Sequence, residues 1–133
     1  MSESVAFDLG SLSGLAEAQE TGTEVHITHP GTGEPLGITM QVAGPDSKRQ
    51  KAATALIIAE RAELRLRKIN AARLEDESVR IAAASIISWT GVMEAGKSID
   101  YSPSAALGLL TRYPFIREQI VSYSGDRANF LKK

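Results

Sequence analysis

Histidine is the side chain with the widest chemical use at neutral pH, and this 133-residue sequence contains two, His26 and His29. Such a pair could indicate a metal site. The two residues fall in a segment predicted to be a β-strand, where side chains three positions apart point to opposite faces. Both therefore cannot reach one ion, and the sequence has no cysteine to complete a set of ligands. We expect surface or turn histidines, with no metal and no cofactor.

Three other motifs with possible chemistry are excluded by their context. A phosphate-binding loop needs a lysine and a Ser or Thr leading into a helix, whereas Gly31-Thr32-Gly33 is followed by Glu34, which would repel a phosphate. The segment 10–14 resembles a nucleophile elbow, but its central residue is Leu12. The acidic residues 75–77 are consecutive, so on a helix they fan out around the axis. We therefore expect no catalytic residue, and the chain is not predicted to be an enzyme.

The net charge of −1 conceals a segregation along the chain. Residues 1–45 carry six acidic residues and no Lys or Arg, whereas residues 46–80 carry nine basic and six acidic residues. Residues 81–133 carry six basic and four acidic residues. The acidic front end and the basic remainder could attract each other within one copy or between neighbouring copies.

Nucleic acids and membranes are not expected as partners. The basic run from Arg61 to Arg73 is interleaved with Glu60 and Glu63, which indicates a solvated face with local ion pairs. Seven aromatic residues are few for a base-stacking surface. No apolar run approaches the ~20 residues of a membrane span, and the first residues lack the pattern of a secretory signal. A DNA-binding regulator remains a less favoured alternative.

The sequence divides into a predicted flexible acidic arm, residues 1–22, and a single globular domain, residues 23–133. Within the arm, one helical turn is expected around Leu15–Gln19. Residues 24–43 alternate between apolar and polar on both sides of a turn rich in Pro and Gly, which predicts a β-hairpin with one apolar face. That face carries Val25, Ile27, Leu36, Ile38 and Met40. It must rest on a helix of the same chain or on another chain, since a lone hairpin is marginally stable.

Four helices are predicted after the hairpin, at about residues 47–74, 77–93, 103–113 and 114–131. The first has Ser47 or Asp46 as an N-cap, and one long helix or two helices with a break near residues 75–78 fit equally well. The third has Ser102 as N-cap and Pro103 in its first position. The fold class is α+β, with a mostly helical body of about four helices and an N-terminal β-hairpin.

Apolar side chains at helical spacing suggest protein–protein contacts. A stripe of small residues follows the first helix, where it would admit a neighbouring helix at close range. For Trp89 a core anchor is the favoured interpretation, and an interface hot spot is an alternative that the sequence does not separate from it. The candidate interaction residues in the helical part are Ala55, Ala59, Ala62, Leu66, Trp89, Phe115, Ile120 and Phe130.

The order of several short motifs resembles the tail assembly chaperones of long-tailed bacteriophages. The shared pattern is a tryptophan segment, a turn with Gly and Lys, a short alanine–leucine helix, a Tyr-Pro pair with Gln-Ile, and a final Asp or Asn with Phe. In this chain the residues are Trp89-Thr90-Gly91-Val92, Gly96 to Ser102, Ala105 to Leu110, Tyr113 to Ile120 and Asp126 to Leu131. The front half agrees through His29 to Glu34 and Gly44-Pro45-Asp46-Ser47, so the resemblance covers residues ~22–131.

The resemblance implies a role in binding other proteins, without catalysis. Proteins of this family bind the long helical tape measure protein, keep it soluble, help to recruit the tail tube protein, and leave before the virion is complete. The expected location is thus the cytoplasm of the bacterial host, outside the mature virion. Self-association into a ring or spiral through head-to-tail contacts is a further expectation. The main alternative is another small phage tail or head–tail completion protein.

Overall fold

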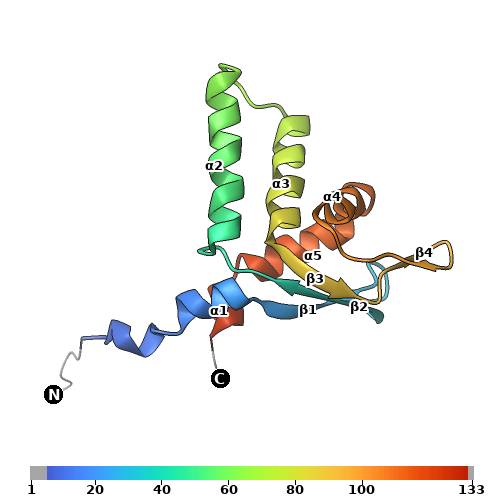
Figure 1. The fold of residues 1–133 in the computed structure, drawn as a ribbon, viewed down its shortest axis with the longest axis horizontal. Coiled ribbons are helices and arrows are strands. Elements are labelled where there is room, and N and C mark those ends of the chain that lie inside the picture. Colours follow the sequence, from blue (N-terminus) through green and yellow to red (C-terminus); the bar gives the residue numbers. More distant parts are fainter. Residues whose placement is uncertain (1–5, 132–133) are drawn as a thin grey trace.

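The computed structural model describes residues 6–131, and the chain folds as α+β (Figure 1). Its helices are α1 (Leu15–Thr21), α2 (Lys48–Glu63), α3 (Ala71–Ser85), α4 (Pro103–Arg112) and α5 (Pro114–Ser124), with short 3₁₀ turns at Leu9–Leu12 and Arg127–Phe130. Its strands are β1 (Thr23–Thr28), β2 (Pro35–Val42), β3 (Ile86–Thr90), β4 (Met93–Glu94) and β5 (Lys97–Ser98). None of the helices within residues 6–131 has the length and apolar content that a membrane span requires.

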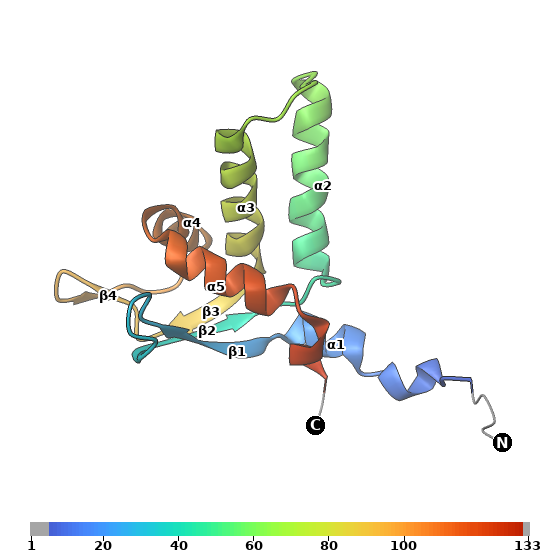
Figure 2. The ribbon, with the colours of Figure 1, turned by 180° about the vertical axis from the view of Figure 1, so that it is seen from behind.

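The predicted hairpin is present as β1 and β2, but it belongs to a larger sheet. The strand order is β1-β2-β3, and both pairs are antiparallel. Val25 pairs with Met40, which in turn pairs with Trp89, so one apolar row crosses all three strands. This inner face packs on helices of the same chain (Figure 2). The core joins it to side chains such as Ala82, Leu110 and Ile120.

The predicted helix over residues 77–93 is wrong in its second half. The helix α3 ends at Ser85, and residues 86–90 form β3 with no loop between the two elements. Trp89 therefore lies on a strand. The β-branched and aromatic residues of this segment favour a strand, and the open edge of β2 supplies hydrogen-bond partners over its length. The Tyr101 hydroxyl and an Arg49 N–H both donate to the carbonyl oxygen of Ile86, at 2.8 and 3.3 Å, which fixes the junction.

The predicted helix over residues 47–74 is also too long. The helix α2 stops at Glu63, and the chain turns through Arg65, whose φ of 53° is left-handed. The helix α3 then begins after the N-cap Asn70, whose side chain accepts a hydrogen bond from the Arg73 N–H at 2.8 Å. The break is therefore at residues 64–70 and not near residues 75–78. A left-handed residue that is neither Gly nor Asn gives no clear signal in a sequence.

The last two predicted helices lie close to where they were expected. Ser102 caps α4, accepting from the Ala105 N–H at 3.0 Å, and Pro103 occupies the first turn. The expected helix over residues 114–131 is shorter: α5 ends at Ser124, and a separate 3₁₀ turn carries Phe130 into the core. Asp126 caps that turn by accepting from the Ala128 N–H at 3.0 Å.

The arm contains more structure than one helical turn. The helix α1 extends from Leu15 to Thr21, and its Gln19 is buried at 1% exposure. The Gln19 side chain donates to the Asp46 carboxylate at 3.0 Å and accepts from the Asp46 N–H at 2.7 Å. Asp46 also pairs with Arg127 at 2.7 Å. These contacts fasten α1 to the start of α2 and to the end of the described chain. Residues 1–5 of the predicted arm lie outside the described residues.

Candidate interaction surface

The helices α2 and α3 form a hairpin that stands away from the sheet, as both ribbon views show (Figure 1, Figure 2). Ser47 caps α2, since its hydroxyl accepts from the Gln50 N–H at 3.3 Å. Near this base, the Gln50 side-chain amide donates to Ser85 Oγ on α3 at 2.9 Å and to Ser124 Oγ on α5 at 3.0 Å. The base of the hairpin is thus joined to the body by polar contacts that leave the outer sides of α2 uncovered.

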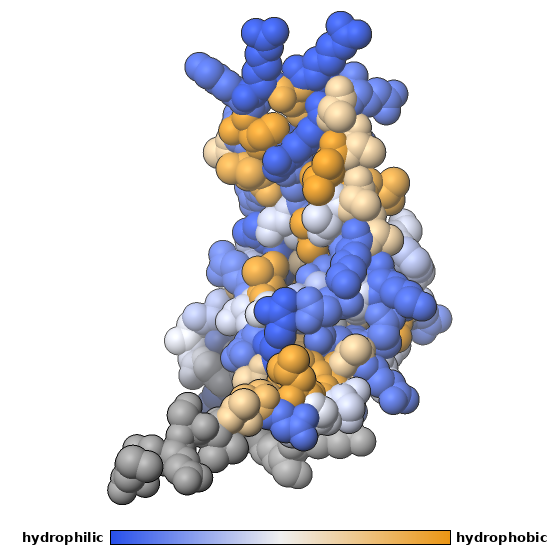
Figure 3. Space-filling view, turned by 90° about the vertical axis from the view of Figure 1, so that its left-hand side faces the viewer, coloured by the Kyte–Doolittle hydropathy of each residue, from blue (hydrophilic) through white to orange (hydrophobic). Residues whose placement is uncertain are grey.

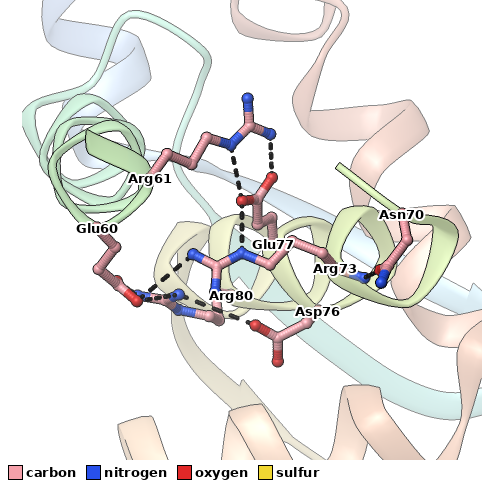
Figure 4. A network of polar contacts seen from close by, with 7 residues as sticks. All are labelled: Glu60, Arg61, Asn70, Arg73, Asp76, Glu77 and Arg80. Atoms are coloured by element: carbon pink, nitrogen blue, oxygen red, sulfur yellow. Dashed lines mark hydrogen bonds and ion pairs between the residues drawn. The ribbon is translucent and has the colours of Figure 1, made fainter. Parts of the chain in front are cut away.

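Farther out, charged side chains hold the two helices together (Figure 4). The Glu77 carboxylate of α3 accepts from Arg61 of α2 and from Arg73 one turn earlier, in each case at 2.9 Å to the Nε atom. The Glu60 carboxylate of α2 accepts from Arg80 of α3 at 3.1 Å to Nη1. We call this set the charge network, and it consists of Glu60, Arg61, Arg73, Asp76, Glu77 and Arg80.

The charge network perturbs the acids that it contains. The hydrogen bond from Arg61 lowers the pKa of the Glu77 carboxyl to about 2, with Arg73 acting in the same direction and burial opposing both. The hydrogen bond from Arg80 likewise lowers the pKa of Glu60. Both carboxylates are therefore charged at neutral pH, and their partners stabilise that charged form. We interpret the charge network as a link between α2 and α3, because each of its carboxylates already pairs with an arginine of the same network.

The side of α2 opposite the buried Ile57 is apolar and exposed. In α2 the buried residue is Ile57, which faces α3. Leu56 and Ile58, on the other sides of the helix, are 62% and 61% exposed. We define the outward face of α2 as Ala52, Ala55, Leu56, Ile58, Ala59 and Ala62, all of which are exposed. Figure 3 shows apolar side chains along this side of the hairpin, interspersed with hydrophilic ones, which also gather at its tip.

A groove of about 440 Å³ lies between α2, α3 and α4, and it is mainly apolar. Its lining combines four alanines of α2 and α3 with Leu56 of α2 and Leu107 of α4. Arg49 and Arg80 also line it. We call it the α2–α4 groove, and it is lined by Arg49, Ala52, Ala53, Leu56, Arg80, Ala83, Ala84, Tyr101, Pro103 and Leu107.

A more open cleft of about 570 Å³ lies between β1 and α5. His26 and His29 both line it, but each has its own local partner. His29 Nδ1 accepts from the Gly31 N–H at 3.0 Å and so shapes the turn, and His26 Nδ1 lies 3.2 Å from Thr39 Oγ1. Gln119 closes the end of β1 by accepting from the Thr28 N–H and donating to its carbonyl, both at 2.9 Å. Within residues 6–131, no three His, Asp or Glu side chains gather into a metal-binding group.

The structure separates the predicted interaction residues into two groups. Those of the sheet and of α5 face the interior, with Leu36 exposed at the strand end and Ile38 and Phe115 partly buried. Those of α2 and the following loop face solvent. The buried residues are Val25, Ile27, Met40, Trp89, Ile120 and Phe130, and the exposed ones are Leu36, Ala55, Ala59, Ala62 and Leu66. For Trp89 the core-anchor interpretation holds: it is 8% exposed, and its indole N–H donates to the Ile99 carbonyl at 2.9 Å.

Sequence reasoning missed three features of the surface. The candidate interaction residues predicted from the sequence do not include Leu56 and Ile58. Leu107 was not connected with α2, since nothing local brings α4 beside it. The sequence predicts a solvated face with local ion pairs for the residues around Arg61; ion pairs are present, but they join α2 to α3, and Glu77 is 4% exposed. Its i, i+4 spacing to Arg73 was the available signal.

Comparisons of the chain with protein-family models, with curated protein sequences and with solved structures give no match.

Proposed function

We propose that this protein is a tail assembly chaperone of a long-tailed bacteriophage. In this proposal it binds the tape measure protein, keeps it soluble and helps to recruit the tail tube protein. The order of motifs over residues ~22–131 is one support. The observation that carries the proposal is the α2–α4 groove, an exposed apolar channel between three helices. Such grooves suit the apolar side of an amphipathic helix, and a tape measure protein is a long helical client.

The charges beside the groove indicate which client residues fit. Arg49, which is exposed, and Arg80 are the basic residues that line the groove. Acidic residues flanking the apolar side of a client helix would be attracted there, while the apolar residues lie between Leu56 and Leu107. The proposed site of action is the host cytoplasm during tail assembly, with release before the virion is complete. Neither a cofactor nor a metal enters the proposal.

Co-expression with the tape measure protein of the same phage tests this function. The tape measure protein is expected to be soluble with this chain and insoluble without it. Leu107→Asp places a charge in the α2–α4 groove and should return the tape measure protein to the pellet. The matched control is Val121→Asp, because Leu107 and Val121 are exposed helix residues at 42% and 45%. The control should leave solubilisation intact.

Two results would contradict the proposal. One is a tape measure protein whose solubility does not depend on this chain. The other is recovery of the chain in purified, finished virions at stoichiometric levels, which would instead favour the alternative of a tail or head–tail completion protein.

A further inference from the structure

The outward face of α2 leaves large aliphatic side chains exposed to water. Leu56 and Ile58 are each exposed by more than 60%, although they flank the buried Ile57. Contiguous apolar surface of this kind on a soluble protein usually marks a contact with another molecule. Another molecule can reach this face along the helix, because the hairpin stands away from the sheet (Figure 1), although Ala52 and Leu56 at its edge also line the α2–α4 groove.

The alanines of this face form a straight seam. Ala52, Ala55, Ala59 and Ala62 follow each other at spacings of three, four and three residues, which places them on one side of a helix. At 100° per residue, the seam lies on the side opposite Ile57, with Leu56 on one flank and Ile58 on the other. Two helices meeting at such a seam approach closely, and the flanking aliphatic side chains then close over it.

The order of residues on this face is nearly the same in both directions. Counting outward from Ile57, the pairs at equal distance are Leu56 and Ile58, Ala55 and Ala59, and Ala52 and Ala62. When two copies of α2 run antiparallel with a two-fold axis at Ile57, Ala55 therefore meets Ala59 of the other copy. Ala52 likewise meets Ala62. The two-fold axis also places each flank of the seam beside the same flank of the other copy, so Leu56 lies next to Leu56 and Ile58 next to Ile58. Every apolar residue faces an apolar residue, as an isologous contact requires.

The charges at the ends of α2 agree with the same register. Arg49 and Glu63 lie on the same flank as Leu56. In the antiparallel pair, Arg49 of one copy therefore comes close to Glu63 of the other copy, and the two-fold axis repeats this pair at the other end of the helices. Both residues are exposed in the single chain. A parallel pair would instead place Arg49 against Arg49. Arg65 would fall opposite Lys51 only if the helix continued, but α2 ends at Glu63 and the chain turns away at Arg65.

We propose that two copies of this chain form a closed, antiparallel dimer through the outward face of α2. A two-fold axis at the middle of α2 puts the two sheets at opposite ends of the paired helices. The inference does not rest on the proposed chaperone function, but the two surfaces share Ala52 and Leu56, so a client helix and the second copy would meet at that edge of α2. It also differs from a head-to-tail ring or spiral, because an isologous contact closes at two copies.

Single cysteines test the register, since the chain has none of its own. Ala55→Cys and Ala59→Cys, mixed and oxidised, are expected to give a disulfide between the two different variants. Each variant alone should cross-link poorly, because its thiols are then displaced by about 6 Å along the helix axis. Thr54→Cys, exposed on α2 but outside the face, is the control and should not cross-link. Strong cross-linking of Ala55→Cys with itself would indicate a parallel pair and overturn the proposal.

Solution mass tests the number of copies. Light scattering is expected to give the mass of two chains for the wild type, falling two-fold to one chain for Ala59→Glu. Thr54→Glu should remain a dimer. Circular dichroism of Ala59→Glu should be unchanged, because the residue is exposed and Glu is a good helix former. A wild-type mass of one chain at all concentrations, or a mass above two chains, would overturn the proposal.

Discussion

The body of the protein and the outer half of the α2–α3 hairpin are stabilised by different forces. In the body, side chains from three strands and three helices close on one another, and Ile27, Met40, Leu110 and Ile120 are fully buried. In the hairpin, α2 buries Ile57 and otherwise meets α3 largely through the charge network. Apolar burial is complete in the first region and incomplete in the second, which shows where this chain has surface left for another protein.

The largest contrast should come from the same substitution in the two regions. Ile120 and Ile58 are both helix residues, but their exposures are 0% and 61%. Ile120→Ala is expected to lower the free energy of unfolding by about 2–5 kcal/mol, since it opens a cavity. Ile58→Ala should change it by less than about 0.5 kcal/mol in the isolated chain. Urea unfolding at low protein concentration measures both, and equal losses would contradict the comparison.

A second pair of substitutions, at two glycines, measures how closely the backbone of the body is packed. Gly91 and Gly96 have nearly the same left-handed φ, 79° and 77°. A Cβ at Gly91 would collide with the carbonyl oxygen of Gly37, whereas at Gly96 it would meet nothing within 4 Å. Gly96→Ala should therefore cost about 1–2 kcal/mol for the backbone conformation alone. Gly91→Ala should cost about 3 kcal/mol. Thermal unfolding of the two variants tests the difference.

The charge network should make the hairpin sensitive to acid. The pKa of Glu77 is lowered in the folded chain to about 2, so its stabilisation is present above the ordinary pKa near 4.5 and is lost as the pH falls toward 2. Glu77→Gln should lower the melting temperature at pH 6, and the gap to the wild type should narrow toward pH 2. Glu118→Gln, at a side chain 70% exposed, is the control and should show no such trend.

The smallest effect is expected at the cap of α3. Asn70→Ala removes the hydrogen bond to the Arg73 N–H and should cost about 1 kcal/mol. Because the cap lies at the outer end of the hairpin, the loss should appear as faster amide hydrogen exchange near residues 71–75. Exchange in α5 should stay unchanged. A uniform increase across the chain would mean that the hairpin and the body unfold together.

Elements with a strong local signal were predictable from the sequence. The hairpin followed from its alternation, and α4 followed from the Ser102-Pro103 pair. Residues 86–90 were not predictable, because Val79, Ala82, Ile86 and Trp89 keep helical spacing into the strand. What decides their structure is the open edge of β2, which is distant along the chain. The loop at residues 64–70 contains no Gly or Pro and so gave no signal.

The candidate surface was predictable only in part. The alanine stripe was found because helical spacing is local information, and its residues proved to be exposed. The α2–α4 groove needs α4 beside α2, and the charge network needs the hairpin to be closed. Both depend on contacts between segments that no local pattern records. The candidate residues of the sheet are apolar, and apolar residues occur both at interfaces and in the core. The sequence alone therefore did not show that they are buried.

The direct passage from α3 into β3 has a mechanical consequence. With no loop between Ser85 and Ile86, and with Tyr101 and Arg49 donating to the carbonyl of Ile86, α3 continues directly into the sheet. The hairpin extends about 24 Å, which is the length of the 16-residue helix α2. Because the charge network joins α2 to α3, a force on α2 reaches β3, the strand that carries Trp89, through α3. Whatever binds α2 is therefore held in one orientation relative to the rest of the molecule.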